Sequence, residues 1–511
     1  MHAENKNMAE TTRHLAENDE SSYGHVLKYI SIFGGVQGLN ILIGLVRNKI
    51  VAYLLGPGGM GLVSLFNSTI NFISQATNLG ISFSAIRHVS ELFDSGDEAR
   101  IKHFVKVVRL WSLLTALIGM LVCVVAGPWL SDYTFSWGNH TLHFIMLAPA
   151  VGLLAVTGGE MAILKGCRKL KALAMIQVYN IFISLVLSVP IYYFFNQTGI
   201  VPVIVLMALA SMIITVCYSY RFYPLDLHGF SQLVGEGSEM IRLGIAFVLA
   251  GVLSSGAEIL IRSYLNVVGD LDMVGYYNAG FMLTMTYAGM VFSAMETDYF
   301  PRLSAVVGSV DKIRETVNRQ IEVTLLIVSP MLTALIIGMP VVIPLLFTSE
   351  FIPIVGMSQV VLLSMYLRAV YLPIAYITLA KGDSVQYLVL EGIYDVLLVL
   401  LVIVGYSWWG LFGTGVALAI ANISDIVIIT FYALARYRFR MSASVVCYLL
   451  LNLLFGFVAY ALTFIGNPYV YWPLGILISL VSLAFSLVVL HRKLSLWNAL
   501  WRKIRNRFKL S

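Results

Sequence analysis

Long apolar stretches separated by short polar connections occupy almost the whole chain. A helix of about 20 residues crosses the hydrocarbon core of a bilayer. At that window length the sequence predicts membrane helices at 27–55, 62–88, 104–127, 141–164, 172–194, 199–220, 243–267, 276–299, 320–347, 353–380, 384–405, 409–434, 443–465 and 471–490. No stretch alternates in the way that a strand of a membrane barrel does. The pattern predicts an all-α polytopic membrane protein with about 14 transmembrane helices.

The composition favours the same class of protein. Hydrophobic residues make up 59% of the 511 residues, charged residues only 12%, and the mean hydropathy is +0.84. A soluble domain carries about 25% charged residues, so this chain cannot cover a soluble globule with a polar surface. The net charge of +6 is small, and most of the basic residues lie in the connections between the predicted spans and in the C-terminal tail. We therefore expect no nucleic-acid partner.

Lys and Arg divide sharply between alternate connections. They occur in one set of connections and in the C-terminal tail, whereas the other set contains none: 56–61, 128–140, 195–198, 268–275, 348–352, 406–408 and 466–470. Because basic residues mark the cytoplasmic side, both termini are predicted to be cytoplasmic.

The two ends of the chain lie outside the predicted spans. Residues 1–24 are polar, contain no apolar signal-peptide region and predict a disordered cytoplasmic tail. Residues 491–511 are basic and carry apolar side chains at helical spacing. This pattern predicts an amphipathic cytoplasmic helix lying on anionic membrane lipids, with a disordered basic tail as the alternative.

Catalytic and metal-binding motifs are missing from the sequence. The four cysteines lie in or beside apolar segments and none forms a CxxC pair. We therefore expect no metal, no cofactor and no disulfide framework. No Walker-type, DxD or HExxH sequence occurs in the predicted cytoplasmic connections. The chain is predicted to be neither an enzyme nor an ATP-driven pump.

An internal repeat divides the chain. Arg47 ends one span and Gly61 opens the next, and Arg262 and Gly275 occupy the same positions six predicted helices later. Parallel repeats of this kind build two lobes in transporters. The predicted domains are an N-lobe at 25–222, a cytoplasmic linker at 223–242, a C-lobe at 243–440 and two additional spans at 441–490.

Basic residues inside the predicted spans are candidates for a binding site. An arginine at the centre of a membrane helix costs about 2.5–3.5 kcal/mol, so Arg47, Arg262 and Arg368 should face water or a partner. Arg262 follows Glu258 by one helical turn, so an ion pair within the helix is an alternative role. Lys49 lies close enough to a span end to snorkel, or to join the site.

Acidic residues inside the spans are candidates for coupling to H⁺ or Na⁺, or for charge pairing. They are Glu258, Glu296, Asp298, Glu391 and Asp395, with Glu160 and Asp425 in similar positions. Glu391 and Asp395 share one helix face.

Guanidinium groups that project from both halves suit an anionic ligand. Phosphate or diphosphate fits best, because Arg binds its oxygens with two parallel hydrogen bonds. Nearby tyrosines offer surfaces for sugar rings, or are ordinary packing and interface residues: Tyr264, Tyr276, Tyr277, Tyr287, Tyr366 and Tyr371.

Several short motifs occur in a fixed order along spans 1 to 12. They are Leu54-Leu55-Gly56-Pro57-Gly58-Gly59-Met60-Gly61-Leu62, Asp272-Met273-Val274-Gly275-Tyr276-Tyr277, Tyr299-Phe300-Pro301-Arg302-Leu303-Ser304 and Leu379-Ala380-Lys381-Gly382. In these motifs the chain resembles the Wzx-type flippases of O-antigen and other lipid-linked oligosaccharides, in the polysaccharide branch of the MOP superfamily.

The resemblance implies two six-helix lobes in a V, with a cationic cavity between them and transport by alternating access. It implies as cargo an undecaprenyl-diphosphate-linked oligosaccharide for lipopolysaccharide or similar polymers, carried to the outer leaflet of the bacterial inner membrane. Association with polysaccharide polymerase machinery is implied as well. The cationic role is carried over to Arg47, Arg262 and Arg368.

Two other functions fit parts of the sequence. A multidrug or organic-cation exporter of the same superfamily would require a carboxylate-rich cavity, whereas several of the deepest charges here are arginines. A membrane glycosyltransferase or polymerase that uses lipid-linked sugars would require positioned acid, base or metal groups. The longest predicted outer connection, 128–140, offers only Asp132 and His140.

Overall fold

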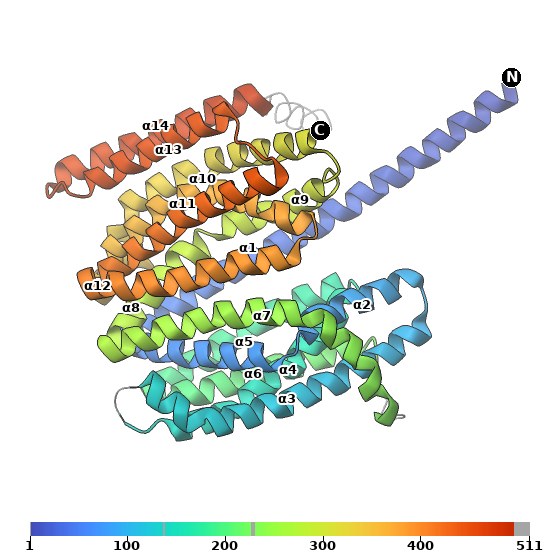
Figure 1. Ribbon diagram of the computed structural model, residues 1–511, viewed down its shortest axis with the longest axis horizontal. Helices are drawn as coiled ribbons and strands as arrows, with labels where there is room; N and C mark the ends of the chain where they lie inside the picture. Colours follow the sequence, from blue (N-terminus) through green and yellow to red (C-terminus); the bar gives the residue numbers. More distant parts are fainter. Residues whose placement is uncertain (1, 136–137, 226–229, 495–511) are drawn as a thin grey trace, which may run out of the picture. The chain divides into compact units, whose positions relative to one another are not determined.

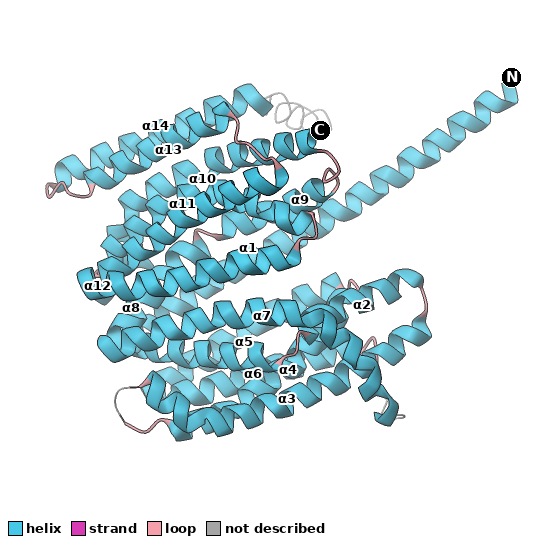
Figure 2. Ribbon diagram, viewed as in Figure 1, coloured by secondary structure: helices cyan, strands magenta, loops and turns pink. Residues whose placement is uncertain are grey.

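The computed structural model describes residues 2–135, 138–225 and 230–494 (Figure 1). Of residues 2–37, 230–247, 293–298, 83, 384, 493 and 494 it describes the backbone alone. Within the described ranges every regular element is a helix (Figure 2). The α-helices are α1 (His2–Thr77), α2 (Ile81–Ser95), α3 (Glu98–Thr134), α4 (Thr141–Gly166), α5 (Leu170–Phe195), α6 (Ile200–Tyr220), α7 (Phe230–Val268), α8 (Leu271–Phe281), α9 (Met290–Ser304), α10 (Val310–Leu346), α11 (Ile354–Ala380), α12 (Ser384–Tyr437), α13 (Ala443–Leu462) and α14 (Pro468–Leu494).

Ten helical segments of the described residues are long and apolar enough to cross a membrane. Three of them, Gly38–Thr77, Leu170–Tyr220 and Val385–Tyr437, contain 40, 51 and 53 residues. Since one crossing takes about 20 residues, each of the three is long enough for two. The prediction of an all-α polytopic membrane protein is confirmed.

Each long segment is interrupted at a predicted connection or within two residues of one. In α1 the backbone leaves the helical region at Gly56, with φ 63°. A residue with a Cβ is strained at this φ. The following Pro57 suits the first turn of a helix, because N–H groups in that turn have no intrahelical acceptor and proline therefore loses no hydrogen bond there. The 3-10 turn Asn196–Gly199 separates α5 from α6, and non-helical Trp409 and Gly410 divide α12.

Two predicted spans are less regular than the hydropathy indicates. The span predicted at 62–88 stops at Thr77 and resumes as α2 after Leu79 and Gly80, both of which have positive φ. The span predicted at 276–299 consists of α8, the π-helical turn Met282–Tyr287 and α9. A hydropathy window of about 20 residues averages over such short breaks.

The chain forms two compact units. Unit 1 contains Met1–Ile50, Thr77–Val125 and His143–Ile245, and unit 2 contains Val51–Ala76, Ala126–Leu142 and Ala246–Ser511. The domain boundaries predicted from the repeat stay a prediction.

The predictions for the chain ends concern residues of which little is described. Helix α1 includes residues 2–24, for which the composition predicted disorder. Ala, Glu, Leu and Lys favour helix locally even in a segment too polar to build a core. The amphipathic helix predicted at 491–511 lies almost entirely outside the described residues.

Apolar stripes at helical spacing build the core of unit 1. Ile81, Ala85 and Val89 of α2 pack with residues of α3 and α4, among them Val105 and Ile163. These side chains are nearly or fully buried. The spacing of four residues places them on one helix face, so burying that face joins the three helices.

Candidate substrate and ion sites in the two units

Arg47 is the predicted binding residue of unit 1. Its side chain is half-buried on the last turns of α1 before Gly56. Nε donates a hydrogen bond to Ser188 Oγ of α5 (3.3 Å), and Nη2 lies 3.9 Å from Met207 Sδ of α6. Ser188 is fully buried and Tyr192, one turn further along α5, is 1% exposed. The guanidinium group therefore lies against a polar strip of α5.

A second arginine of unit 1, Arg109 of α3, was not among the residues predicted from the sequence. It binds Glu160 of α4 through two contacts, Nε–Oε1 at 2.8 Å and Nη2–Oε2 at 3.3 Å. The two side chains are 10% and 3% exposed. Glu160, a candidate for ion coupling or for charge pairing, is thus held in a buried ion pair.

Arg109 also binds the chain that follows α6. Nη2 donates to the carbonyl oxygen of Tyr223 (2.8 Å) and Nη1 to that of Pro224 (3.2 Å). Its Cζ lies 4.3 Å from the centre of the Tyr220 ring. The sequence did carry a signal for this residue, because Arg109 lies inside the predicted span 104–127 and needs a partner there.

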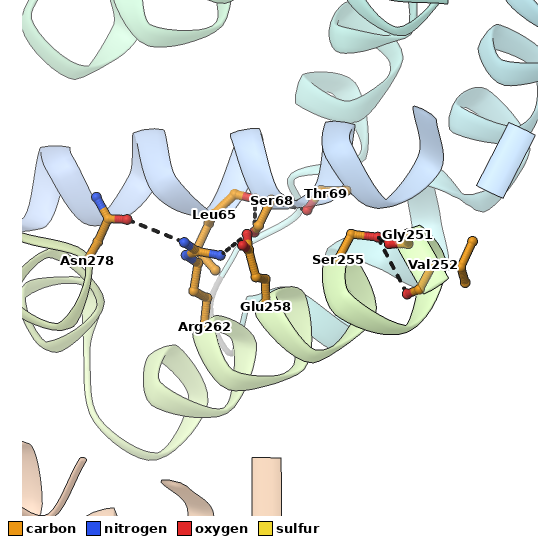
Figure 3. A network of polar contacts seen from close by, with 9 residues as sticks. All are labelled: Leu65, Ser68, Thr69, Gly251, Val252, Ser255, Glu258, Arg262 and Asn278. Carbon is orange, nitrogen blue, oxygen red and sulfur yellow. Dashed lines mark hydrogen bonds and ion pairs between the residues drawn. The ribbon is translucent and has the colours of Figure 1, made fainter. Parts of the chain in front are cut away.

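Arg262 of α7 forms the ion pair that its spacing allowed. Nη1 lies 2.7 Å from Glu258 Oε2, and Nη2 donates to Asn278 Oδ1 of α8 at 3.4 Å (Figure 3). Arg262 is 8% exposed. Figure 3 shows its side chain pointing from α7 towards the part of α1 that carries Leu65 and Ser68. In this conformation Arg262 joins helices of unit 2, and its role in substrate binding stays a prediction.

Arg368 of α11 is half-buried in unit 2. Its Nη1 lies 3.2 Å from Met285 Sδ in the π-helical turn. Its charge interacts with Glu391 and Asp425 of α12. Arg368 therefore shares its surroundings with carboxylates.

Asp395 lies in the same region of unit 2. It is 8% exposed and interacts electrostatically with Glu391 on its own helix and with Glu258 of α7. Its Oδ2 is buried without a hydrogen-bond partner among the described residues. The fold thus brings Glu391 and Asp395, expected to share a helix face, near Glu258 of α7, and brings Glu391 near Asp425 beyond the break in α12.

The remaining predicted residues divide into several groups. Lys49 is half-buried on α1, two residues beyond Arg47. The side chains of Glu296 and Asp298 lie outside the described residues. Tyr366 and Tyr371 are not available to sugars, because both are buried and their hydroxyls bind Thr333 (2.8 Å) and Asn422 (3.1 Å).

A cavity of about 670 Å³ lies elsewhere in unit 2. Its walls come from α10, the start of α13 and the end of α14, and the predicted site residues are not among them. They are Asp311, Arg314, Glu315, Asn318, Arg319, Glu322, Val323, Leu326, Ser442, Ser444 and Leu490.

The fold is that of transporters of the MOP superfamily. The chain superposes on the lipid II flippase MurJ in an inward closed conformation, with a TM-score of 0.70 and 15% identity over 90% of this chain and 99% of the other. It also superposes on an inward-facing multidrug resistance MATE family transporter of the MOP superfamily, with a TM-score of 0.65 and 17% identity over 78% and 94%. At these identities the likeness shows the fold alone.

The family is shown by the sequence. The profile of the family described as "Polysaccharide biosynthesis protein" matches residues 50–356, more than half of the chain. The chain belongs to this family. It is also 22% identical over 290 residues to the lipid III flippases of Escherichia coli (strain K12) and Shigella flexneri. This match covers 54% of the chain and 66% of each relative, just under two thirds of their length.

Proposed function

We propose that this protein is a flippase for a polyprenyl-diphosphate-linked oligosaccharide. Its cargo would be an O-antigen or similar surface-polysaccharide repeat unit, carried from the cytoplasmic to the outer leaflet of the bacterial inner membrane. Membership of the polysaccharide biosynthesis family and the likeness to a lipid III flippase support this proposal. The observation that carries it is that the spans of both units hold arginine side chains, Arg47 in unit 1 and Arg262 and Arg368 in unit 2.

Diphosphate recognition follows from the chemistry of these groups. A guanidinium group keeps its charge at all physiological pH values and donates in a planar fork that matches phosphate oxygens. Away from bulk water such contacts are stronger, because the local dielectric constant is low. Arg47, Arg368 and Lys49 would bind the diphosphate, and Arg262 would contribute if the cargo displaced Asn278 or Glu258.

Transport would proceed by alternating access with both termini in the cytoplasm. The distribution of Lys and Arg between the connections supports this orientation. Polysaccharide polymerase machinery would receive the exported cargo at the outer leaflet.

The test is translocation by purified protein in liposomes. A fluorescent undecaprenyl-diphosphate oligosaccharide is placed in one leaflet, and an impermeant quencher reports its arrival in the other. Arg47→Ala and Arg368→Ala should each lower the rate about tenfold or more, because each removes a charge-assisted hydrogen bond. Arg87→Ala is the matched control, since Arg87 forms an exposed ion pair with Glu91. Full activity of both variants at normal protein levels would refute the proposed site.

Ion coupling would use the carboxylates of unit 2. Asp395 has a buried oxygen without a partner among the described residues, and the negative charges of Glu391 and Glu258 act on it. Such a cluster holds a proton or Na⁺ more readily than an isolated exposed carboxylate, because its negative charges repel one another. An imposed Na⁺ or H⁺ gradient should therefore accelerate translocation by the unaltered protein.

The same carboxylates favour a second candidate function. A multidrug exporter would use Glu258, Glu391, Asp395 and Asp425 to hold an organic cation, and one superposed structure is a multidrug resistance transporter. The same liposomes distinguish the two. Gradient-driven efflux of ethidium without movement of the lipid-linked oligosaccharide would favour the exporter.

A further inference from the structure

The cavity of about 670 Å³ between α10, α13 and α14 lies where the sequence predicts the membrane to end. One face of α10 forms most of its wall. This face is charged from Asp311 to Glu322 and apolar at Val323 and Leu326. The change falls within a few residues of the predicted start of span 320–347. A molecule that fills the cavity therefore needs a charged end and an apolar end.

Hydrogen bonds from α10 hold the connection that leads into α13. Asn318, which is 7% exposed, donates to the carbonyl oxygen of Arg440 (3.1 Å) and accepts from Ser442 N (2.8 Å). Arg314 Nη2 donates to the carbonyl oxygen of Arg438 at 3.0 Å. Asn318 and Arg314 therefore fix the position of this wall of the cavity.

The start of α13 contributes partial positive charge to the cavity. Ser442 caps this 20-residue helix, its Oγ accepting from Val445 N at 3.2 Å, and Ser444 of the first turn also lines the cavity. Backbone N–H groups in the first turn of a helix, together with the helix dipole, favour an anion. This part of the cavity suits a phosphate group.

Glu315 and Arg319 carry opposite charges on the α10 wall of the cavity. Their i,i+4 spacing permits an ion pair within the helix, such as the one between Arg87 and Glu91 at 2.9 Å. Among the described residues, however, the side chains of Glu315 and Arg319 form neither an ion pair nor a hydrogen bond. The carboxylate and the guanidinium group lie about 6 Å apart along the helix axis, at 1.5 Å per residue. Both groups can therefore bind a ligand.

We infer that the cavity binds a membrane phospholipid whose headgroup contains a phosphate and a primary ammonium group, as in phosphatidylethanolamine. Arg319 and the first turn of α13 hold the phosphate, and Glu315 holds the ammonium group. Val323 and Leu326 contact the start of an acyl chain. The two-carbon link between phosphate and ammonium matches the spacing of one helical turn between Arg319 and Glu315.

The charge of the wall disfavours purely anionic lipids. Acidic residues outnumber basic ones three to two: Asp311, Glu315 and Glu322 against Arg314 and Arg319. Phosphatidylglycerol adds an anion without a cation, and a polyprenyl diphosphate adds two anionic groups, so both are repelled by the acidic residues. The cavity thus favours a zwitterionic lipid of the membrane over the proposed cargo.

Native mass spectrometry of delipidated protein in detergent tests the inference, because it resolves each bound lipid molecule. Phosphatidylethanolamine should bind about tenfold more tightly than phosphatidylcholine, since the trimethylated ammonium of choline has no N–H to donate to Glu315. Equal affinity for these two lipids, or tighter binding of phosphatidylglycerol, would overturn the inference.

A headgroup without acyl chains distinguishes a lipid from a soluble phosphate ester. Glycerophosphoethanolamine should bind at least about tenfold more weakly than phosphatidylethanolamine, because it buries no apolar surface at Val323 and Leu326. Binding as tight as that of the lipid would identify a soluble ligand and overturn the inference.

Two variants separate the roles of the charged residues. Glu315→Gln should abolish the preference for phosphatidylethanolamine over phosphatidylcholine, whereas Arg319→Gln should weaken both lipids about tenfold, because both contain a phosphate. Arg87→Gln and Glu91→Gln are the matched controls, since these residues have the same spacing but pair with each other. Both controls should leave the two affinities unchanged.

The preference between the two lipids is a ratio measured on one preparation, so a general loss of folding does not imitate its disappearance. An undiminished preference in Glu315→Gln would overturn the inference. The measurement contains no lipid-linked oligosaccharide, so its outcome is independent of the proposed flippase function.

Discussion

In unit 1 the carboxylate of Glu160 is bound on both oxygens by Arg109, whereas in unit 2 the carboxylates of Glu258, Glu391, Asp395 and Asp425 lie near one another and near two arginines. In unit 1 the contacts of Arg47 include those with Ser188 and Met207. Under the proposed function, unit 1 would hold a fixed anionic group and unit 2 would gain and lose cations. Unit 2 contains an ion pair as well, Arg262 with Glu258, but further carboxylates lie near it.

The largest expected effect concerns the buried ion pair of unit 1. Arg109→Ala leaves Glu160 buried without its partner, and breaking one side of such a pair costs about 3–5 kcal/mol of stability. The free energy of unfolding in detergent measures this loss. Replacing both residues by leucine should recover most of it, because no unpaired charge remains. Arg87→Ala, at an exposed pair with Glu91, should leave unfolding nearly unchanged.

The next effect compares the two arginines of the proposed cargo site. Arg47→Gln should lower transport about tenfold, because it removes a charge-assisted hydrogen bond to the diphosphate. Arg368→Gln should lower transport and also shift the pH at which it is half-maximal, since the Arg368 charge acts on Glu391 and Asp425. Identical pH profiles for the two variants would remove the distinction between the units.

A smaller effect is expected at Asp395. Asp395→Asn keeps the size of the side chain and removes its charge, so about fivefold less stimulation by an ion gradient is expected while transport without a gradient persists. Rates in liposomes with and without the gradient measure this ratio. Glu91→Gln, at an exposed position of α2, is the control. Unchanged stimulation in Asp395→Asn would place coupling elsewhere.

The smallest effect should follow from Asn278→Ala. This change removes the 3.4 Å contact to Arg262, while the 2.7 Å pair with Glu258 remains. A loss of about 0.5–1.5 kcal/mol in unfolding free energy is expected for one hydrogen bond. Glu258→Ala should cost clearly more. If the two variants lose the same stability, Glu258 is not the main partner of Arg262.

Hydropathy predicted the helices well and their interruptions less well. The short gaps between apolar runs at Gly56 and near Trp408 indicated the breaks in α1 and α12 to within two residues. The break at Leu79 and Gly80 and the π-helical turn Met282–Tyr287 escaped it, because each spans only a few residues inside an apolar run. Average hydropathy depends on residue types over a long window, so a break of a few residues in the backbone does not show in it.

The candidate site was predicted only in part. The i,i+4 spacing indicated the pair of Arg262 with Glu258, because both residues lie on one helix. Arg109 was missed, and its partner Glu160 lies 51 positions away on another helix. The contact of Arg47 with Ser188 joins residues 141 positions apart. Spacing within one helix has no information on such pairs.

By itself the sequence determined that the chain crosses a membrane as helices. The bilayer core offers no water to the backbone N–H and C=O groups of these long apolar segments, so the groups must bond to one another within each helix. It also determined the internal repeat, in which Arg47 corresponds to Arg262 and Gly61 corresponds to Gly275. Only the tertiary structure decided which buried charges are neutralised and which side chains line the cavity between α10, α13 and α14. Those outcomes depend on which helix faces pack together. The free energy of that packing comes from contacts between segments far apart in the sequence, and a local sequence pattern does not encode such contacts.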